Sequence, residues 1–324
     1  MNIGLAYDLQ TDPADPRQAE FDPPATLKAV CQSLEHLGHR VDRLGSARQL
    51  LAEPQRLRAV DLVFNLAEGS QGRCREAWVP MLCELHGVPY VGSDPLALML
   101  GLDKVATKRI AAAEGIATPR WLCAASAAEL PAPCPLRFPV IVKPRHEGSG
   151  RAIDAGAVVG DAAALAARVA WVTAECAQPA LIEEFIDHGE LTVLVIGNDP
   201  PVAYPAVQRP VDVATRLSCH LLPEPARSDW IAPLTLDLGL DAAARQAAEQ
   251  LFRALGCRDM ARVDFRVARD GALYVLEINP LPSVDPAGTF GLLAESLGLT
   301  YGALVGRVMD AALARLGRSA AVAS

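Results

Sequence analysis

Two carboxylates face each other in a predicted β-hairpin, and this pair is the first sign of chemistry in the chain. Two β-prone runs between residues 262 and 279 flank Asp270-Gly271, a pair that tolerates the positive φ angles of a tight two-residue turn. That turn places Asp264 opposite Glu277. Carboxylates directly opposite each other in a sheet repel, and a divalent cation would remove the conflict.

The same register decides what each face of the hairpin holds. It pairs Arg262 with Asn279 beside the two acids. Two acids and an amide suit Mg²⁺ or Mn²⁺, and the arginine could stabilise developing negative charge. The other face is an apolar ladder suited to a core, with the pairs Val263–Ile278, Phe265–Leu276 and Val267–Tyr274. The alternative is a surface hairpin whose outward face is charged.

The composition indicates room for two or three packed domains. The chain has 324 residues, of which 51% are hydrophobic. The net charge of −8 and the pI near 5.3 argue against nucleic acid or an anionic membrane as a partner recognised through bulk charge. No uninterrupted apolar segment reaches membrane-spanning length, and Asp8 interrupts the first apolar run before a signal-peptide core could form.

Cysteine and lysine usage add two smaller points. The eight cysteines include no Cys-x-x-Cys pair, so neither a disulfide framework nor a zinc site is expected, and the natural compartment is a reducing cytoplasm. Only four of the 30 basic residues are lysine, namely Lys28, Lys104, Lys108 and Lys143. In a chain that prefers arginine, a retained lysine can mark a place where a compact ammonium is needed.

The N-terminal part of the chain alternates strands with helices. Strands are predicted at 2–7, 39–44, 59–66 and 89–91, and helices at 24–38 and 74–86. This alternation predicts a small parallel sheet covered on both faces. The first turn lacks Gly-x-Gly-x-x-Gly, so a nicotinamide-binding function has no support.

Two lysines lie at the ends of predicted elements in the next part. A helix at 103–114 carries Lys104 near its start, and a strand at 138–144 carries Lys143 near its end. A glycine–serine loop follows at 146–151. Such a loop can wrap backbone N–H groups around phosphate oxygens, although it is not a Walker A loop, and alone it is more often a simple turn.

Two adjacent acids end a later apolar strand. The strand at 180–186 contains Glu183 and Glu184, and Glu190 follows soon after. These acids could read an adenine edge and a ribose diol, or be solvated strand ends. Residues 198–237 are rich in proline and are expected to include strands of a larger antiparallel sheet. Helices are predicted at 161–177, 241–255 and 290–316.

With these pieces in order, the sequence resembles the ATP-grasp superfamily, and within it the D-alanine–D-alanine ligase-like group, across nearly its whole length. Any one matching segment would be weak, but their order and spacing together are specific. The segments are Phe64-Asn65-Leu66, residues 88–93, Leu102-Asp103-Lys104, residues 138–144, Glu147-Gly148-Ser149, residues 182–186 with Glu190, residues 261–265, and residues 276–279 followed by Pro282.

The resemblance implies a fold of mixed α/β and α+β class, the ATP-grasp fold. An N-terminal Rossmann-like (pre-ATP-grasp) domain would span residues 1–95 and a central small α+β subdomain residues 96–182. A C-terminal antiparallel-sheet domain at 183–324 would carry the metal site. Related ligases are often homodimers, so a homodimer is a further expectation.

The resemblance also implies a nucleotide site. Lys104 and Lys143 would hold the phosphates of ATP, Ser149 would approach the γ-phosphate, and Glu190 would take the ribose hydroxyls. The adenine hinge would be formed by Glu183, Glu184, Phe185 and Ile186. Asp264, Glu277 and Asn279 would bind Mg²⁺ or Mn²⁺, and Arg262 would stabilise a tetrahedral intermediate.

The phosphate-binding residues depart from the family pattern at two points. The family loop usually reads Glu-Gly-Ser-Ser-x-Gly, whereas this loop ends in Ala152, whose β-carbon can restrict the backbone. The family also often has a further phosphate-contacting lysine before the metal hairpin. This chain has no lysine after Lys143, so Arg209 or Arg216 would have to serve, or the contact is missing.

The substrate end diverges further. D-alanine ligases typically follow the metal asparagine with Thr-x-Pro-Gly-x-Thr and a serine–leucine pair, whereas here residues 280–285 and Gly288-Thr289 take those places. The N-terminal segment lacks the usual glycine-rich loop and acid, and Glu20 or Asp22 is the nearest substitute for binding an amino group. These two acids, with Arg209, Arg216, Ser283 and Asp285, are otherwise ordinary loop residues.

Retained ATP motifs and altered substrate loops favour an ATP- and Mg²⁺-dependent carboxylate–amine ligase. It would join amino acids or related small acids through an acyl phosphate and release ADP and phosphate. Two alternatives remain open. One is a true D-alanine–D-alanine ligase, and the other is a non-catalytic ATP-binding protein with this fold.

Overall fold

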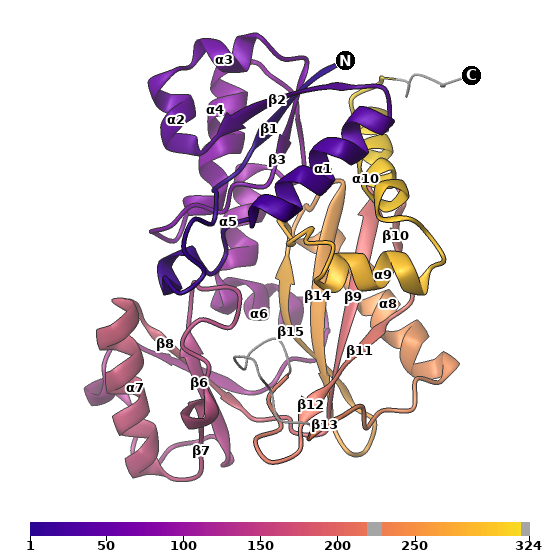
Figure 1. Cartoon of the computed structure of the whole chain (residues 1–324). Coiled ribbons are helices and arrows are strands. Elements are labelled where there is room, and N and C mark those ends of the chain that lie inside the picture. Colours follow the sequence, from indigo (N-terminus) through magenta and orange to yellow (C-terminus); the bar gives the residue numbers. More distant parts are fainter. Residues whose placement is uncertain (219–228, 319–324) are drawn as a thin grey trace.

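The computed structural model of the chain describes residues 1–218 and 229–318. Part of the proline-rich stretch at 198–237 therefore lies outside the described residues. Three larger sheets meet near the middle of the molecule, as Figure 1 shows. None of the described helices has the length and apolar character needed to cross a bilayer.

The N-terminal sheet is parallel and covered on both faces, as predicted. Its strands are β1 (Asn2–Ala6), β2 (Arg40–Gly45), β3 (Leu62–Asn65) and β4 (Tyr90–Val91), in the order β2-β1-β3-β4. Helices α1 (Pro24–His36) and α10 (Tyr301–Arg315) cover one face, and α2 (Ala47–Ala52), α3 (Gln55–Arg58) and α4 (Trp78–His86) cover the other. The strand predicted at 59–66 starts later because α3 and a turn precede it.

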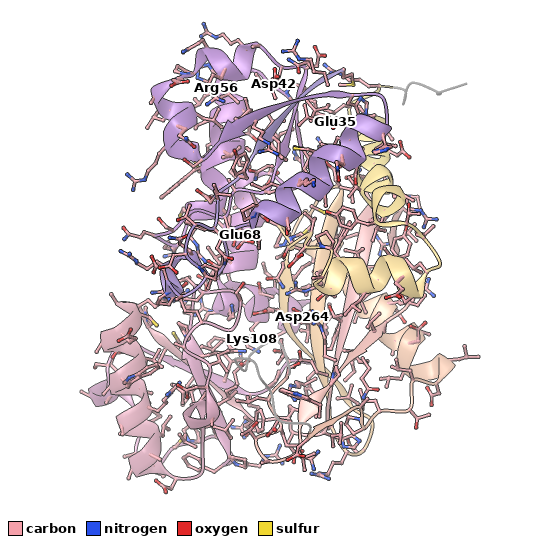
Figure 2. All side chains as sticks on the ribbon, in the orientation of Figure 1. Glu35, Asp42, Arg56, Glu68, Lys108 and Asp264 are labelled. Carbon is pink, nitrogen blue, oxygen red and sulfur yellow. The ribbon has the colours of Figure 1, made fainter. Side chains whose placement is uncertain are left out.

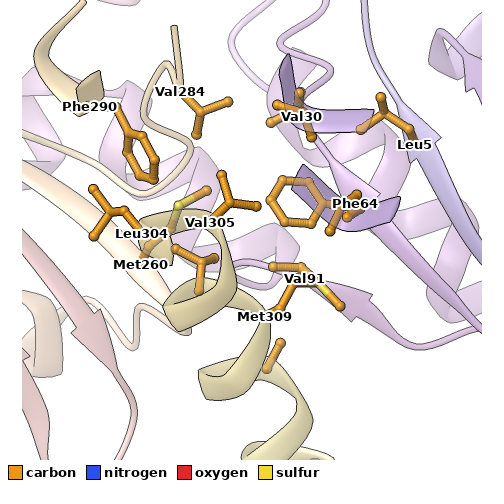
Figure 3. Close-up of a cluster of buried hydrophobic side chains, with 14 of the residues drawn as sticks. Leu5, Val30, Phe64, Val91, Met260, Val284, Phe290, Leu304, Val305 and Met309 are labelled. Atoms are coloured by element: carbon orange, nitrogen blue, oxygen red, sulfur yellow. The ribbon is translucent and has the colours of Figure 1, made fainter. Parts of the chain in front are cut away.

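One hydrophobic cluster joins the two ends of the chain. Leu5 and Phe64 of the N-terminal sheet belong to the same buried cluster as Val305 and Met309 of α10, which lies beside α1. Figure 3 shows Met260 in this cluster too, at the start of strand β14. The N-terminal and C-terminal sheets are therefore held against each other by a shared core.

The central sheet carries the predicted strand of Lys143. It has the order β5-β8-β6-β7 with β5 (Trp121–Ala124), β6 (Val140–Pro144), β7 (Val158–Val159) and β8 (Ala180–Glu184). All its pairs are antiparallel, and α7 (Ala162–Cys176) covers one face.

The short 3-10 helices of the described residues are η1 (Pro16–Gln18), η2 (Arg75–Ala77), η3 (Ala127–Glu129) and η4 (Ala155–Ala157).

The C-terminal sheet is antiparallel. It contains β9 (Gly189–Gly197), β10 (Pro201–Ala203), β11 (Val207–Arg209), β14 (Met260–Val267) and β15 (Leu273–Asn279), and α8 (Leu238–Ala254) packs on one face. Strands β10 and β11 confirm the antiparallel strands predicted within 198–237, whereas β12 (Val211–Asp212) and β13 (Trp230–Ile231) form a separate two-stranded sheet. The remaining helices are α5 (Pro95–Leu102), α6 (Lys104–Ala113) and α9 (Thr289–Ser296).

The hairpin of β14 and β15 keeps the predicted register only beside the two acids. Asp264 pairs with Glu277, and Arg262 pairs with Asn279. The predicted pairs Phe265–Leu276 and Val267–Tyr274 are wrong, because Phe265 pairs with Val275 and Val267 with Leu273. The like-charge pair that motivated the metal prediction is therefore present, while the far half of the ladder is shifted.

Two local features cause the shift. Leu276 is an extra residue on β15, a β-bulge, so it and Glu277 both turn toward the same face. The turn also has three residues rather than two, since the Ala268 N–H donates to the Ala272 carbonyl at 2.8 Å. Gly271 closes it with φ 84°, the left-handed conformation that such turns need.

Helix α6 and all of α5 except its first residue lie within the segment 96–182 that is predicted to form the central subdomain, yet both helices pack on β15. The division at 95 and 182 stays a prediction.

Candidate active site

A cavity of about 400 Å³ lies where the central and C-terminal sheets face each other. It brings together predicted residues from five strands, the start of helix α6 and two loops. Those that line it are Lys104, Lys143, Ser149, Glu183, Glu184, Phe185, Ile186, Glu190, Arg262, Asp264 and Glu277. Figure 2 shows Asp264 near the centre of the molecule, with Glu68 closer to the N-terminal sheet.

Strand periodicity explains why these side chains converge. On β14, Val263 and Phe265 enter the core under α8, so the alternate residues Arg262 and Asp264 face the cavity. On β6, Lys143 shares the cavity face with Ile141. The interiors of both sheets are apolar, and the charged residues meet at the faces that oppose each other.

The two acids among the three predicted metal ligands are each bound to a cation of the chain. Arg262 donates to both oxygens of Asp264, with Nε–Oδ1 at 3.0 Å and Nη2–Oδ2 at 2.8 Å. Lys104 Nζ lies 3.0 Å from Glu277 Oε2. Asn279 Nδ2 donates to Asp264 at 3.2 Å. These contacts relieve the repulsion between the two opposed acids.

The charges around these acids keep both of them ionised. Burial alone would raise the pKa of Glu277, but Lys104 and Lys143 outweigh it and lower the pKa to about 2. Burial opposes ionisation of Asp264 as well, and Arg262 lowers the pKa of that carboxyl. The Asp264, Glu277 and Asn279 oxygens form a hard-ligand set that fits a divalent cation.

That set has two carboxylates rather than three. Over the described ranges, no three His, Cys, Asp or Glu side chains come together as a metal-binding group. A magnesium ion here would need further oxygen ligands from water or a substrate phosphate, which is how Mg²⁺ is usually held.

Glu183 is a buried acid with open acceptor capacity. Its side chain is fully buried, and Lys143 Nζ lies 2.5 Å from Oε2 while Lys108 pairs with Oε1. Apart from these two ammonium groups, no donor among the described residues reaches either oxygen. Burial would raise the pKa of Glu183, but the two ammonium groups lower it. An N–H group of a ligand would donate a hydrogen bond to an oxygen of Glu183 and so satisfy it.

The rest of the predicted adenine hinge divides between the two faces of β8. Phe185 and Ile186 line the cavity together with Ile141 and Leu276, which gives a flat base an apolar enclosure. The Glu184 carboxylate is bound by Arg137 at 3.0 Å, while the residue itself lines the cavity, and its part in the hinge stays a prediction. Because alternate residues of a strand point to opposite sides, only Glu183 of the two acids points inward.

Glu190 is held by a buried arginine. Arg266 Nε lies 3.2 Å from Glu190 Oε2, and both side chains are about 95% buried. The two residues are direct cross-strand partners on β14 and β9. Neither Glu183 nor Glu190 is a solvated strand end, so that alternative is wrong.

Three residues of the glycine–serine loop and its end have the positive φ angles of the left-handed region. Ser149 has φ 46°, Gly150 has φ 67° and Ala152 has φ 60°. Ala152 therefore adopts the conformation that the usual glycine would favour, and the Arg168 guanidinium holds its carbonyl at 2.7 Å.

Glu20 contacts this loop from the N-terminal lobe. Its Oε1 accepts from the Gly148 N–H at 2.6 Å, and its Oε2 accepts from Arg75 at 2.6 Å. A β-carbon on Gly148 would collide with Glu20. Arg75 also donates to the His146 carbonyl at 2.7 Å. Glu20 is thus more than an ordinary loop residue, because it joins two parts of the site.

Several other predicted loop residues reach the cavity. Arg209, Ser283 and Asp285 line it, as do Gly288 and Thr289. Arg216 lies on a turn with φ 60°, and its carbonyl accepts from Arg266 at 2.9 Å. Of the two arginines that could replace the missing lysine, only Arg209 is among the described residues that line the cavity, and its role there stays a prediction. Asp22 is buried, and burial with nearby Asp8 and Asp285 raises its pKa to about 8.

The sequence analysis missed four residues that hold the site residues in place. They are Arg75, Lys108, Thr192 and Arg266. Lys108 had a signal, since it is one of four lysines and lies one helical turn after Lys104. Arg266 also had a signal, because it lies on the same strand face as Arg262 and Asp264. Arg75 and Thr192 had no comparable signal.

Comparison with known proteins places the chain in a family. The family model described as "D-ala D-ala ligase C-terminus" matches residues 112–310. The chain belongs to the D-alanine–D-alanine ligase family. A D-alanine–D-alanine ligase of Synechococcus sp. (strain JA-3-3Ab) is 32% identical over 305 residues, which is 90% of this chain and 88% of the relative. As a member of this family, the protein is an ATP-dependent ligase.

One further relative and one solved structure are similar to the chain over most of its length. The protein y4sG of Sinorhizobium fredii, whose function is uncharacterized, is 33% identical over 297 residues, 88% of this chain and 86% of the relative. The crystal structure of a D-alanine–D-alanine ligase from Bacillus anthracis complexed with ATP has a TM-score of 0.74 and 22% identity, and covers 97% of this chain and 98% of that one. At that identity the likeness shows the fold, which is ATP-grasp as predicted.

Proposed function

We propose that this protein joins amino acids or related small acids by ATP-dependent amide formation. ATP phosphorylates a substrate carboxylate, a substrate amine attacks the acyl phosphate, and ADP and phosphate are released. The observation that carries the proposal is one cavity lined by Lys104, Lys143 and Arg262 together with Asp264 and Glu277. These are the cations and ligands that phosphoryl transfer and acyl transfer require.

Each residue has a distinct task in this scheme. Lys104 and Lys143 hold the phosphates, and Glu183 with the apolar wall around it takes the base. Asp264, Glu277 and Asn279 would hold Mg²⁺ or Mn²⁺, which would neutralise charge on the transferring phosphoryl group. Arg262 is held by Asp264 at the same edge and is placed for the negative charge that develops at the attacked carbon.

The phosphate loop supplies backbone N–H groups to the phosphates. Ser149 and Gly150 line the cavity, and their left-handed conformations suit a loop that wraps N–H groups around phosphate oxygens. Arg209 replaces the missing late lysine as a further phosphate contact. The small-molecule substrates enter beside Ser283, Asp285 and Gly288, which line the same cavity.

Release of ADP and phosphate from the purified protein tests this proposal. ATP, Mg²⁺ and pairs of amino acids in both chiral forms are supplied, and release is expected only when a carboxylate and an amine substrate are both present. Glu277→Gln is the matched control, because it removes one predicted metal ligand. Tight ATP binding without release for any pair would overturn the proposal.

A true D-alanine–D-alanine ligase is the second candidate, and the relatives that bear that name at 30–35% identity favour it. The altered residues 280–285 count against it. D-alanine with ATP alone decides between the two, since the second candidate requires D-alanyl-D-alanine as the product.

A cytoplasmic location, a homodimer and the absence of nucleic-acid partners belong to the same proposal. The net charge of −8 supports the absence of nucleic-acid partners, and the lack of any Cys-x-x-Cys pair among the eight cysteines supports a reducing cytoplasm. The homodimer rests on the resemblance to ligases that are often dimers.

A further inference from the structure

Two buried cations that the proposed mechanism does not use lie against the two acids of the nucleotide pocket. Lys108 contacts Glu183, and Arg266 contacts Glu190. Both cations come from elements outside the adenine hinge, Lys108 from α6 and Arg266 from β14. The two pairs have the same construction, because in each one a cation of the fold holds an acid that faces the cavity.

Lys108 holds Glu183 from within the fold. Its side chain is 0% exposed, and among the described residues that line the cavity are Glu183 and Lys143 but not Lys108. Its ammonium also donates to Thr118 Oγ1 at 2.6 Å, and that hydroxyl donates to the Val275 carbonyl on β15 at 2.9 Å. The position of Lys108 is therefore fixed by the strand that carries the metal ligands.

The second cation on Glu183 has another task. Lys143 lines the cavity and sits 2.5 Å from Glu183 in this structure, but the proposed function requires it at the phosphates. When Lys143 turns to a phosphate, Glu183 would be a buried acid without a counter-charge unless Lys108 stayed. A fully buried carboxylate without a cation takes up a proton and ceases to accept at that oxygen.

Arg266, which holds Glu190, is itself fixed by three contacts. It pairs with Glu190 across the β9–β14 ladder, donates to the Arg216 carbonyl at 2.9 Å and lies over the Phe185 ring at 5.4 Å. A guanidinium fixed on three sides is pre-organised, so the acid it binds is fixed as well. The carboxylate is then ready to accept from the two vicinal hydroxyls of a ribose.

We propose that Lys108 and Arg266 are positioning residues for nucleotide recognition. Lys108 keeps Glu183 placed to accept from the amino group of the base, and Arg266 keeps Glu190 placed to accept from the ribose hydroxyls. The inference rests on the proposed function, which puts ATP in this cavity. It adds that each of the two recognition acids depends on its own buried cation.

Direct binding of three nucleotides tests the proposal without requiring any ligase substrate. Dissociation constants for ATP, inosine triphosphate and 2′-deoxy-ATP are measured by calorimetry with Mg²⁺ present. Inosine triphosphate lacks the amino group, and 2′-deoxy-ATP lacks one ribose hydroxyl. In the unaltered protein, ATP is expected to bind about tenfold tighter than either analogue, since each lacks one hydrogen bond to a charged acceptor.

The two variants are expected to lose different preferences. Lys108→Met removes the preference for ATP over inosine triphosphate and keeps the preference over 2′-deoxy-ATP. Arg266→Met does the reverse. The matched substitutions Lys28→Met and Arg253→Met, at exposed positions on α1 and α8, keep both preferences.

Two results would overturn the proposal. The first is equal weakening of all three nucleotides in either variant, because that is the result of a direct phosphate contact or of general destabilisation. The second is an unaltered protein that binds ATP but does not distinguish it from the analogues. Failure of the unaltered protein to bind any nucleotide would instead contradict the proposed function itself.

A paired variant covers the case in which Lys108→Met does not fold. Lys108→Met with Glu183→Gln replaces both buried charges with neutral groups of similar size. It is expected to have the same preference for ATP over inosine triphosphate as Glu183→Gln alone. A further loss in the double variant would show that Lys108 acts through some other group, and the proposal would fall.

Discussion

The cavity and the loops of the N-terminal part next to it handle buried charge in opposite ways. On the nucleotide side, formed by the central and C-terminal sheets, the acids on the strands have cations: Lys108 and Lys143 hold Glu183, Arg266 holds Glu190, Arg262 holds Asp264 and Lys104 holds Glu277. On the N-terminal side, formed by the loops after β1 and β3, acids outnumber cations. The nucleotide side is therefore built around stable ionised groups, and the N-terminal side is not.

The N-terminal acids show the imbalance in their pKa values. Burial raises the pKa of Glu76 to about 8, with a further contribution from Glu20. Burial with Glu20 and Glu76 as neighbours also raises the pKa of Glu68 well above its ordinary value. Asp22 and Glu76 form no ion pair with any residue that the structure describes. The buried acids of the N-terminal side therefore lower the stability of the folded chain, as groups at functional sites often do.

Removing an acid from the balanced side is expected to have the largest effect, and the effect is on turnover. Glu277→Gln takes away a proposed metal ligand and the partner of Lys104, so kcat for ADP release is expected to fall about 1,000-fold. Asp270→Asn, at the exposed tip of the same hairpin, is the matched control and leaves kcat unchanged. A kcat within twofold of the unaltered protein would refute the metal assignment.

Arg75 tests the boundary between the two sides. It is 3% exposed and bound to Glu20, which in turn holds Gly148 of the phosphate loop. Arg75→Met leaves Glu20 without its cation and is expected to lower the free energy of unfolding by about 3 kcal/mol in urea denaturation. Arg73→Met, whose side chain is 65% exposed, is expected to cost less than about 0.5 kcal/mol.

The double variant Arg75→Met with Glu20→Gln separates charge imbalance from lost packing. It is expected to regain part of the lost stability, because the neutral amide needs no counter-charge. If Arg75→Met and Arg73→Met lowered the free energy of unfolding equally, the contact between Arg75 and Glu20 would contribute nothing to stability.

The two sides also differ in how far the sequence predicts them. Alternation along a strand depends only on the pleat, so the cavity face of β14 with Arg262 and Asp264 was predictable. The bulge at Leu276 and the three-residue turn were not, because Asp270-Gly271 fits both turn lengths. The local pattern of the strand determines its cavity face, and packing around the hairpin determines the bulge and the turn length.

The supporting residues were harder to predict for a different reason. The contact between Arg266 and Glu190 depends on the register of β9 against β14, which joins residues 76 positions apart. Arg75 meets Glu20 and the phosphate loop only once two lobes have packed together. Such contacts have no periodic signal, whereas the ATP motifs do, and this is why the N-terminal side was the less predictable one.

Glu76 tests whether the N-terminal acids cost stability. Between its ordinary value of 4.5 and its raised pKa of about 8, the folded chain holds a proton that the unfolded chain has released. Stability should therefore fall as the pH rises through this window. Glu76→Gln removes that slope and is expected to be roughly 2 kcal/mol more stable than the unaltered protein at pH 8.

Urea denaturation at several pH values measures this slope. The exposed Glu295→Gln is the control and should keep the slope of the unaltered protein. Parallel curves for Glu76→Gln and the unaltered protein would show that this acid is not held neutral, and the contrast between the two sides would lose its electrostatic basis.

Ala152 provides the smallest test, because strain on the nucleotide side is in the backbone rather than in its charges. Its φ of 60° costs a residue with a β-carbon roughly 1–2 kcal/mol, while glycine adds about 0.5–1 kcal/mol of unfolded-state entropy. Ala152→Gly should therefore raise the free energy of unfolding by about 0.5 kcal/mol. Ala167→Gly, at an exposed position within α7, should lower it by about 1 kcal/mol. The same substitution would then have opposite signs at the two positions, and two losses of equal size would show that the loop is not strained.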